Sequence, residues 1–359
     1  MRNKCVLPLA LIFLIGVALR IYNLGFQCSW MEEDYTATIS QMPFTQIWTV
    51  TTSTDFTPPL FYWLEHFIGL VIGYSYLAMR ILPAIFGIMC IPAMYYLGRE
   101  FKDEIAGLFC AGSVAALYPM VYYSQFARAY TLSFLFFILM LAYYIKILKS
   151  DHRPGTLVTF GILAALCIWS HAFSLIPISF ILLDLLLRFR LSKESGYTFA
   201  PLALGLIPLV GMPFVLLKDR VIQTMKLPFG LNSTELLVIL PNEFFNVLYP
   251  FFWLLTIAGL VYERNPFTRS VSFKLAGIAV LTVIVALVIS SITPMYARYF
   301  LHVSFIFILV SAGAVSGILS KVTQKQWVKI AVVILVMILF LILQNADFIA
   351  YYTVQKYVC

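Results

Sequence analysis

Three acidic residues in a row, Glu32, Glu33 and Asp34, follow the first apolar stretch of the chain. The sequence of 359 residues holds only 16 acidic residues, so this run requires an explanation. Adjacent carboxylates repel one another and raise the pKa of one of them, an effect that general bases and metal sites exploit. Glu32 and Glu33 are therefore candidate catalytic residues and candidate ligands of a divalent metal ion, with Asp34 as a further candidate. Consecutive side chains on a helix point about 100° apart, so at most two of the three would face one pocket. The alternative is that the acids cap a surface helix over 34–48.

Three single arginines, Arg80, Arg128 and Arg298, are expected at the ends of apolar spans. Guanidinium groups bind phosphate oxygens in a bidentate way and stay charged at any relevant pH. The alternative is that each arginine extends to lipid headgroups. Acids near an acceptor and arginines near a phosphate, within a membrane, together indicate transfer from a lipid phosphate carrier. A carboxylate would take the proton from an acceptor hydroxyl, and the arginines or a metal would stabilise the departing phosphate.

Further polar candidates lie close to these groups in the sequence. Asp55 precedes Pro58-Pro59, a pair that ends one segment and begins a helix carrying His66. An interfacial position reaching water would explain His66 equally well. His171, in Trp-Ser-His-Ala, has the simpler interpretation of a satisfied histidine at a helix end.

The composition predicts the elements that must position these residues. Hydrophobic residues make up 62% of the chain and charged residues 11%, whereas a soluble domain has about 25% charged residues. Repeated apolar windows of about 20 residues predict an all-α polytopic membrane protein. The net charge of +8 fits basic cytoplasmic loops, and no basic run with interleaved aromatics indicates nucleic-acid binding. We expect about 11 transmembrane helices, near 5–22, 79–98, 105–123, 129–148, 155–171, 173–189, 199–217, 244–262, 274–292, 299–319 and 328–346.

The side of each loop follows from the basic residues, which collect in short cytoplasmic loops. If the N-terminus is cytoplasmic and 58–73 lies along the membrane surface, the inside holds two thirds of the 24 basic residues. We therefore expect one transmembrane domain over 1–359, with a long first extracytoplasmic loop at 23–77 that carries surface-lying helices and a later one at 218–243. The candidate acids, histidines and arginines then share one extracytoplasmic level. Charges at the edges of apolar spans are costly and tend to mark function.

Several short motifs occur in order along the chain. They are Arg-Ile-Tyr-Asn-Leu-Gly-Phe at 20–26 leading into Trp-Met-Glu-Glu at 30–33, Thr-Pro-Pro-Leu-Phe-Tyr at 57–62, Ala-Met-Arg-Ile-Leu-Pro-Ala-Ile-Phe-Gly at 78–87, Tyr-Tyr-Ser-Gln-Phe-Ala-Arg-Ala-Tyr at 122–130, Ser-His at 170–171 and Arg-Tyr at 298–299. Their order and spacing resemble the GT-C superfamily of glycosyltransferases that use lipid-linked sugars. Within it, the sequence is similar to glycosyltransferase family 39, which includes the protein O-mannosyltransferases, and to the related lipid A aminoarabinose transferases.

The resemblance implies that the first-loop acids are catalytic and are candidate metal ligands, and that Arg80 and Arg128 contact phosphate or shape the site. It adds Gln125 and Tyr299 to the candidate site. The sequence departs from the family in three places. Glu32 stands where relatives have an aspartate, so the choice of base between Glu32 and Glu33 stays open. Phe126 replaces an acid, and Thr57-Pro58 replace a Glu-Lys pair, which leaves Asp55 as the nearby acid for a metal.

We therefore expect an integral-membrane glycosyltransferase, of the hexosyl or pentosyl class, acting on the extracytoplasmic face, in the plasma membrane of a prokaryote rather than the endoplasmic reticulum. It would move a sugar from a polyprenyl-phosphate or -diphosphate carrier to a hydroxyl on a protein, glycan or lipid, with inversion. A possible divalent metal ion is the cofactor considered, membrane lipids are expected partners, and no nucleic acid is expected. The alternatives are a transporter or lipid flippase, or a ligase or polymerase of lipid-linked glycans.

Overall fold

The computed structural model describes residues 3–53, 57–191, 195–207, 231–292 and 295–354. Within these ranges the chain is helical, apart from one isolated antiparallel bridge between Leu231 and Met295. The α-helices and the 3₁₀-helices (η) are α1 Asn3–Ile21, α2 Met31–Ser40, α3 Phe44–Ser53, α4 Leu60–Ile72, α5 Tyr76–Phe101, α6 Glu104–Ala116, α7 Tyr118–Ser124, α8 Tyr130–Leu148, α9 Pro154–Ser170, η1 Ala172–Ser174, α10 Leu175–Leu191, α11 Ser195–Leu206, α14 Ser233–Phe245, η3 Asn246–Leu248, α15 Tyr249–Tyr262, α16 Pro266–Ile292, η4 Ala297–Phe300, α17 His302–Val322, α18 Gln326–Leu343 and α19 Asn345–Thr353.

The protein is an integral multi-pass membrane protein. Among the described residues, 8 helical segments are long and apolar enough to cross a membrane, or 9 if the bent pair α6 and α7 forms one span. The predicted count of 11 is not confirmed. Two predicted spans fall short of the required length: α9 has 17 residues, and α11 has 12 residues within the described ranges. The expected outer loop at 218–243 is described only from residue 231, and its last part is helix α14.

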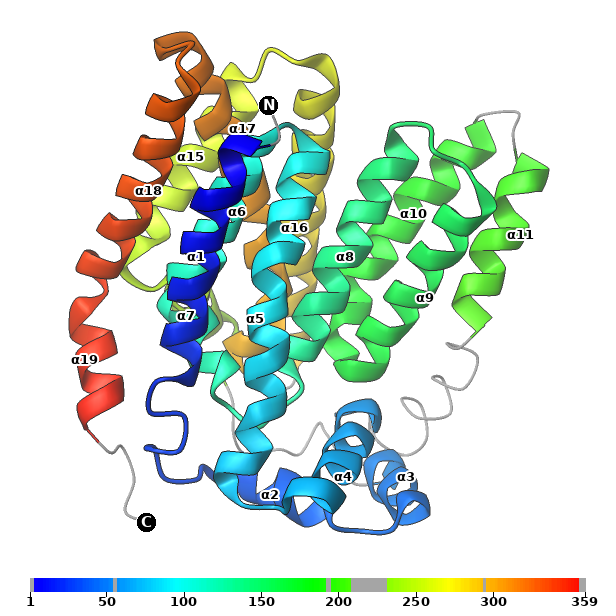
Figure 1. Cartoon of the computed structure of the whole chain (residues 1–359). Coiled ribbons are helices and arrows are strands. Elements are labelled where there is room, and N and C mark those ends of the chain that lie inside the picture. The colour runs from blue at the N-terminus through cyan, green and yellow to red at the C-terminus, as the bar shows by residue number, and fades with distance from the viewer. Residues whose placement is uncertain (1–2, 54–56, 192–194, 208–230, 293–294, 355–359) are drawn as a thin grey trace.

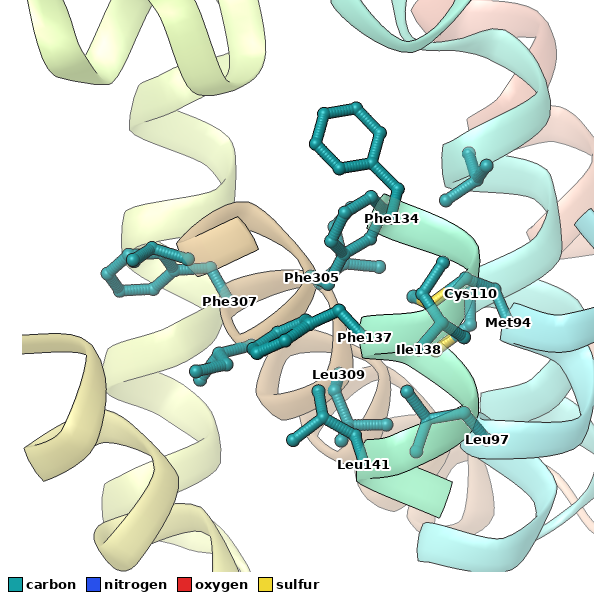
Figure 2. Close-up of a cluster of buried hydrophobic side chains, with 14 of the residues drawn as sticks. Met94, Leu97, Cys110, Phe134, Phe137, Ile138, Leu141, Phe305, Phe307 and Leu309 are labelled. Carbon is teal, nitrogen blue, oxygen red and sulfur yellow. The ribbon is translucent and has the colours of Figure 1, made fainter. Parts of the chain in front are cut away.

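The central helices of the bundle are α8 and α17. The apolar windows of both are 78% buried, against 22% for α1 and 17% for α18, which therefore present most of their surface to lipid. Figure 2 shows the contact between the central pair, where Phe134 and Phe137 of α8 meet Phe305 of α17. Aromatic rings bury much area in few rotamers, so this contact fixes the two helices relative to each other.

The first loop folds against one end of the bundle, which we call the loop end (Figure 1). Helix α4 has 13 residues, about 20 Å, and cannot cross a hydrocarbon core of about 30 Å. Helix α1 ends and α5 begins at the loop end, so residues 22–75 leave and re-enter the bundle on the same side. Segment 58–73 is thus a helix packed at the membrane surface.

A break between α6 and α7 shapes the floor of the loop end. The sequence predicts one span over 105–123, but the two helices meet at 61° because Pro119 begins α7 and cannot continue α6. The break leaves the last carbonyls of α6 without helical partners. Arg20, fully buried at the end of α1, donates hydrogen bonds to the Val114 oxygen (2.7 Å) and the Ala115 oxygen (3.3 Å). It also donates to Ser124 Oγ (3.1 Å), and so holds α1 against the break.

Candidate active site

The three consecutive acids lie in the first turn of α2 and point to three different partners. Asp34 is exposed and accepts a hydrogen bond from the Tyr76 hydroxyl (2.7 Å) at the start of α5. Glu33 points into the protein to Arg80, and Glu32 points to Arg298. This divergence follows from the rotation of about 100° per residue on a helix. The acids therefore do not form one cluster.

Glu33 and Arg80 form a buried ion pair that joins α2, α5 and two loops, and we call this pair the latch. The side chain of Glu33 is 2% exposed and that of Arg80 is 3% exposed. Arg80 Nε donates to Glu33 Oε1 (2.9 Å) and Arg80 Nη2 donates to Oε2 (2.6 Å). Each carboxylate oxygen also accepts a backbone N–H, from Ala127 (2.9 Å) and from Trp30 (3.1 Å) respectively. The bond from Trp30 caps the N-terminus of α2, so the capping interpretation applies to Glu33.

The guanidinium of Arg80 is occupied by the same latch. Its remaining N–H groups donate hydrogen bonds to the backbone oxygens of Gln27 (2.7 Å), Cys28 (3.2 Å) and Leu24 (3.3 Å). A group that donates five hydrogen bonds to protein while 2% exposed has little capacity left for a phosphate. The structure thus places Arg80 with Glu33, apart from Arg128 and Arg298.

Glu32 and Arg298 form a second, more accessible pair. Arg298 Nη2 donates to Glu32 Oε1, and the two side chains are 18% and 19% exposed, Arg298 first. The guanidinium also lies over the Tyr296 ring, 4.1 Å from its centroid. Glu32 Oε2 and Arg298 Nε have no hydrogen-bond partner among the described residues. The pair therefore contains one buried acceptor and one buried donor that no described residue satisfies.

Arg128 lies in the turn between α7 and α8 and reaches the first loop. It donates to the Tyr62 hydroxyl (3.0 Å) and to Thr36 Oγ1 (3.3 Å) through Nη1, and to Thr57 Oγ1 (2.9 Å) through Nη2. Arg128 and Thr57 line a narrow cavity of about 60 Å³, together with Ala129, Tyr130, His171, Ala172, Phe173 and Tyr299. We call this the arginine cavity.

His171 and Tyr299 form the aromatic wall of the arginine cavity. Tyr299 stacks on Phe173, with ring centroids 4.6 Å apart, and burial raises the pKa of Tyr299 to about 12. Burial, together with the nearby charges of His302 and Arg128, lowers the pKa of His171 well below its ordinary value. His171 is therefore neutral at neutral pH, and its Nδ1 has no hydrogen-bond partner among the described residues.

A larger cavity of about 380 Å³ lies on the other side of Tyr123 and Tyr130, whose ring centroids are 4.9 Å apart. Arg298 lines this larger cavity, so the Glu32–Arg298 pair adjoins it. We call it the acidic cavity, because Glu243 and Asp347 are in its wall. Its lining residues are Trp30, Tyr118, Pro119, Tyr122, Tyr123, Phe126, Asn242, Glu243, Asn246, Arg298 and Asp347.

The remaining candidates occupy positions that hold the fold. Gln125 is 2% exposed, and its amide donates to the Arg20 oxygen (2.9 Å) and the Tyr22 oxygen (3.0 Å), which closes the end of α1. His66 Nδ1 lies 2.9 Å from the Ser40 backbone oxygen and links α4 to α2. Asp55 lies outside the described residues.

The metal-ligating side chains of the described residues do not form a metal site. No group of three His, Cys, Asp or Glu side chains comes together in these ranges of the chain. Glu33 is unsuited as a ligand because both of its oxygens already accept two hydrogen bonds. Glu32 offers one oxygen, Oε2, and no second described ligand joins it.

Sequence reasoning missed the acidic wall and two buried side chains. Glu243 and Asp347 are distant in sequence, and only the packing of α14 and α19 brings them to one cavity. His302 is buried, with Nε2 at 2.8 Å from Ser133 Oγ. Arg20 belonged to a recognised motif, but its role at the α6–α7 break needs the tertiary structure. One sequence feature could have indicated these four residues: each is a polar side chain at the edge of an apolar segment.

Comparison with known proteins confirms that the chain resembles the GT-C glycosyltransferases. The family model of the dolichyl-phosphate-mannose-protein mannosyltransferases matches residues 57–215. No sequence among the curated proteins matches the chain.

Solved structures with the same fold cover nearly the whole chain. One is the archaeal oligosaccharyltransferase AglB from Archaeoglobus fulgidus in complex with an inhibitory peptide and a dolichol-phosphate, with a TM-score of 0.59, 14% identity, and coverage of 97% of this chain and 56% of that one. Another is ArnT from Cupriavidus metallidurans bound to undecaprenyl phosphate, with a TM-score of 0.59, 15% identity, and coverage of 92% and 62%. A third is the Archaeoglobus fulgidus oligosaccharyltransferase in complex with Zn and sulfate, with a TM-score of 0.56, 16% identity, and coverage of 95% and 53%. The chain thus spans between 53% and 62% of the length of these three proteins.

Proposed function

We propose that this protein is a membrane glycosyltransferase that moves a sugar from a polyprenyl-phosphate or -diphosphate carrier to an acceptor hydroxyl, with inversion at the anomeric carbon. The observation that carries the proposal is the Glu32–Arg298 pair, which adjoins the acidic cavity and lies one residue from Tyr299 in the arginine cavity. A carboxylate with one buried oxygen that accepts no hydrogen bond from the described residues thus lies beside both the cationic cavity and the acidic one. The structures of AglB and ArnT, which share the fold, hold dolichol-phosphate and undecaprenyl phosphate respectively.

In the proposed reaction Glu32 is the general base. Its Oε2 takes the proton of the acceptor hydroxyl as the hydroxyl oxygen bonds to the anomeric carbon. The bond from that carbon to the carrier phosphate breaks, and its electron pair stays on the phosphate oxygen. Arg128 and the hydroxyls of Thr57 and Tyr299 are the donors proposed to stabilise the phosphate, because all three line the arginine cavity.

Glu33 and Arg80 are positioning residues in this proposal. The latch fixes the first turn of α2 against α5 and the Ala127 backbone, and so fixes Glu32 one residue away. Gln125 and Arg20 fix the α7 side in the same way. We infer that the loop end is extracytoplasmic, since most basic residues are expected at the opposite end. Cys28 in the first loop is disulfide-bonded, which fits an oxidising compartment, such as the outer face of a prokaryotic plasma membrane.

The test is transfer by the purified protein in detergent, with a panel of polyprenyl-phosphate sugars and hydroxyl acceptors. Glu32→Gln should lower the rate constant by about 10²–10⁴-fold, as expected for loss of a general base. Asp34→Asn is the matched control, because Asp34 is the neighbouring acid and points to Tyr76. Full activity in Glu32→Gln would exclude Glu32 as the base. If no donor of the panel is turned over, and the protein reconstituted in lipid vesicles moves the intact lipid between leaflets, the flippase alternative is favoured instead.

A further inference from the structure

The acidic cavity has two kinds of wall. One is aromatic: Tyr122 and Phe126 stack with ring centroids 6.0 Å apart and planes 22° apart, and Tyr118 lies 6.0 Å from Tyr122. The other is polar and comes from α14, η3 and α19. There the Glu243 carboxylate accepts a hydrogen bond from the Tyr123 hydroxyl, and the Asp347 carboxylate accepts one from the Asn246 amide (2.7 Å).

Each of these carboxylates has unused capacity. Oε2 of Glu243 and Oδ1 of Asp347 accept no hydrogen bond from the described residues, and both side chains line the cavity. An ionised carboxylate accepts hydrogen bonds through two oxygens, and charge-assisted bonds are the stronger ones. The free oxygens therefore favour a ligand rich in hydroxyl or ammonium donors. They disfavour an anionic group beside this wall, and Arg298, the cation that also lines the cavity, is already paired with Glu32.

An aromatic wall and a polar wall in one cavity together favour a particular class of ligand. Aromatic faces are electron-rich and attract the C–H face of a ring, whereas the carboxylates and the Asn242 and Asn246 amides bind hydroxyl groups. A volume of about 380 Å³ is near the lower end of the range for small-ligand sites, which suits one or two sugar rings rather than a long polymer. The carbon chain of a lipid would leave the polar wall without partners.

We propose that the acidic cavity binds a pyranose ring of an uncharged or cationic saccharide, and that it selects against uronic acids and other anionic sugars. This rests on the proposed glycosyltransferase function, which it deepens by naming the class of sugar. Arg298 is in the cavity wall and is paired with Glu32, so the proposed sugar site adjoins the proposed base. The ring is either that of the acceptor or that of the donor, since both carry the same chemistry.

Binding is measured without turnover, by saturation-transfer NMR of the detergent-solubilised full chain with methyl glycosides. The probes are a neutral hexose, an N-acetylhexosamine, an amino hexose and a hexuronate. The first three should bind, and the hexuronate should bind about tenfold more weakly or worse, because one charge-assisted interaction corresponds to roughly that factor. Equal affinity of the hexuronate and the neutral hexose would overturn the proposal.

Variants locate the site. Glu243→Gln and Asp347→Asn, on separate helices, should each weaken binding of the neutral hexose about tenfold and reduce the discrimination against hexuronate. Glu100→Gln, at the far end of α5, is the matched control and should change neither value. If both cavity variants keep the parent affinity while folding normally, the cavity is not the sugar site.

Kinetics distinguish the two sources of the ring. In Glu243→Gln, a raised KM for the donor during hydrolysis without acceptor identifies the ring as the donor's. A raised KM for the acceptor alone identifies it as the acceptor's. Glu32→Gln should slow transfer by about 10²–10⁴-fold but keep glycoside binding. Loss of the proposed reaction and loss of the proposed sugar site are therefore separate results.

Discussion

Replacement of Glu33 by glutamine tests whether the buried latch stabilises the fold rather than performs the reaction. Glu33→Gln keeps the shape of the side chain but removes its charge, and the guanidinium of Arg80 then stays buried without an ionic partner. The amide also presents an NH₂ group where one carboxylate oxygen accepted two N–H donors. The NH₂ group of the glutamine then faces N–H donors in a site closed to water, and these hydrogen bonds cannot form.

The magnitude follows from burial. Removing one partner of a buried ion pair costs about 3–5 kcal/mol, because the remaining charge is left uncompensated. At about 1.4 kcal/mol per factor of ten, the ratio of folded to unfolded protein falls by roughly 10²–10⁴-fold. Glu32→Gln should cost less, about 1–3 kcal/mol, because the side chains of Glu32 and Arg298 are 19% and 18% exposed and water can replace part of the lost interaction. The two substitutions are therefore expected to have different main effects: Glu33→Gln should mainly lower stability, and Glu32→Gln should mainly lower the rate of transfer.

Equilibrium unfolding in mixed micelles with increasing SDS, followed by tryptophan fluorescence, measures the first effect. The midpoint should fall clearly for Glu33→Gln and only slightly for Glu32→Gln. Adding Arg80→Met to Glu33→Gln should recover part of the loss, since the uncompensated charge is then gone. If Glu33→Gln unfolded with the parent midpoint and lost transfer activity, Glu33 would be the base and the latch interpretation would be refuted.

Two further predictions concern the arginine cavity and the surface helix α4. Arg128→Lys should raise the KM for the lipid donor about tenfold or more in steady-state transfer, because a lysine cannot reproduce the bidentate fork on a phosphate; an unchanged donor KM would place the phosphate elsewhere. Burial raises the pKa of Glu65 well above its ordinary value, and Glu65 Oε1 has no hydrogen-bond partner among the described residues, so the folded state binds this proton more tightly than the unfolded state. The stability from this group is complete below the ordinary pKa of about 4.5 and is lost as the pH rises through the raised value, so Glu65→Gln should flatten the pH dependence of the SDS midpoint and exceed the parent at alkaline pH. A variant with the same pH slope as the parent would contradict this.

The sequence allowed the class of fold to be predicted. It also allowed the prediction that the candidate acids, histidines and arginines lie at one end of the bundle. Composition and apolar windows are properties of local segments, and they predicted a helical membrane protein with surface helices in the first loop. The rotation of 100° per residue predicted that at most two of Glu32, Glu33 and Asp34 would face one pocket; in the structure the three point to three different partners. The break at Pro119 was visible as a proline, but the apolar run around it favoured a single span.

Partners within the site could not be predicted in the same way. Arg80 was expected at a phosphate because an isolated arginine at a helix end resembles Arg128 and Arg298 in sequence. Its burial against Glu33 depends on how α2 packs on α5, which no local pattern encodes. Glu243 and Asp347 reach one cavity from helices about 100 residues apart, for the same reason.

The arginine at the end of α1 bears on the order in which the protein is assembled. Arg20 donates to residues that follow it by 94, 95 and 104 positions in the chain. During synthesis the first span therefore enters the bilayer before any of these acceptors exists, and its guanidinium has to stay hydrated at the membrane surface. Only after α6 and α7 are inserted does this cation leave water. Packing of α1 against the break between α6 and α7 is thus a late event in biogenesis.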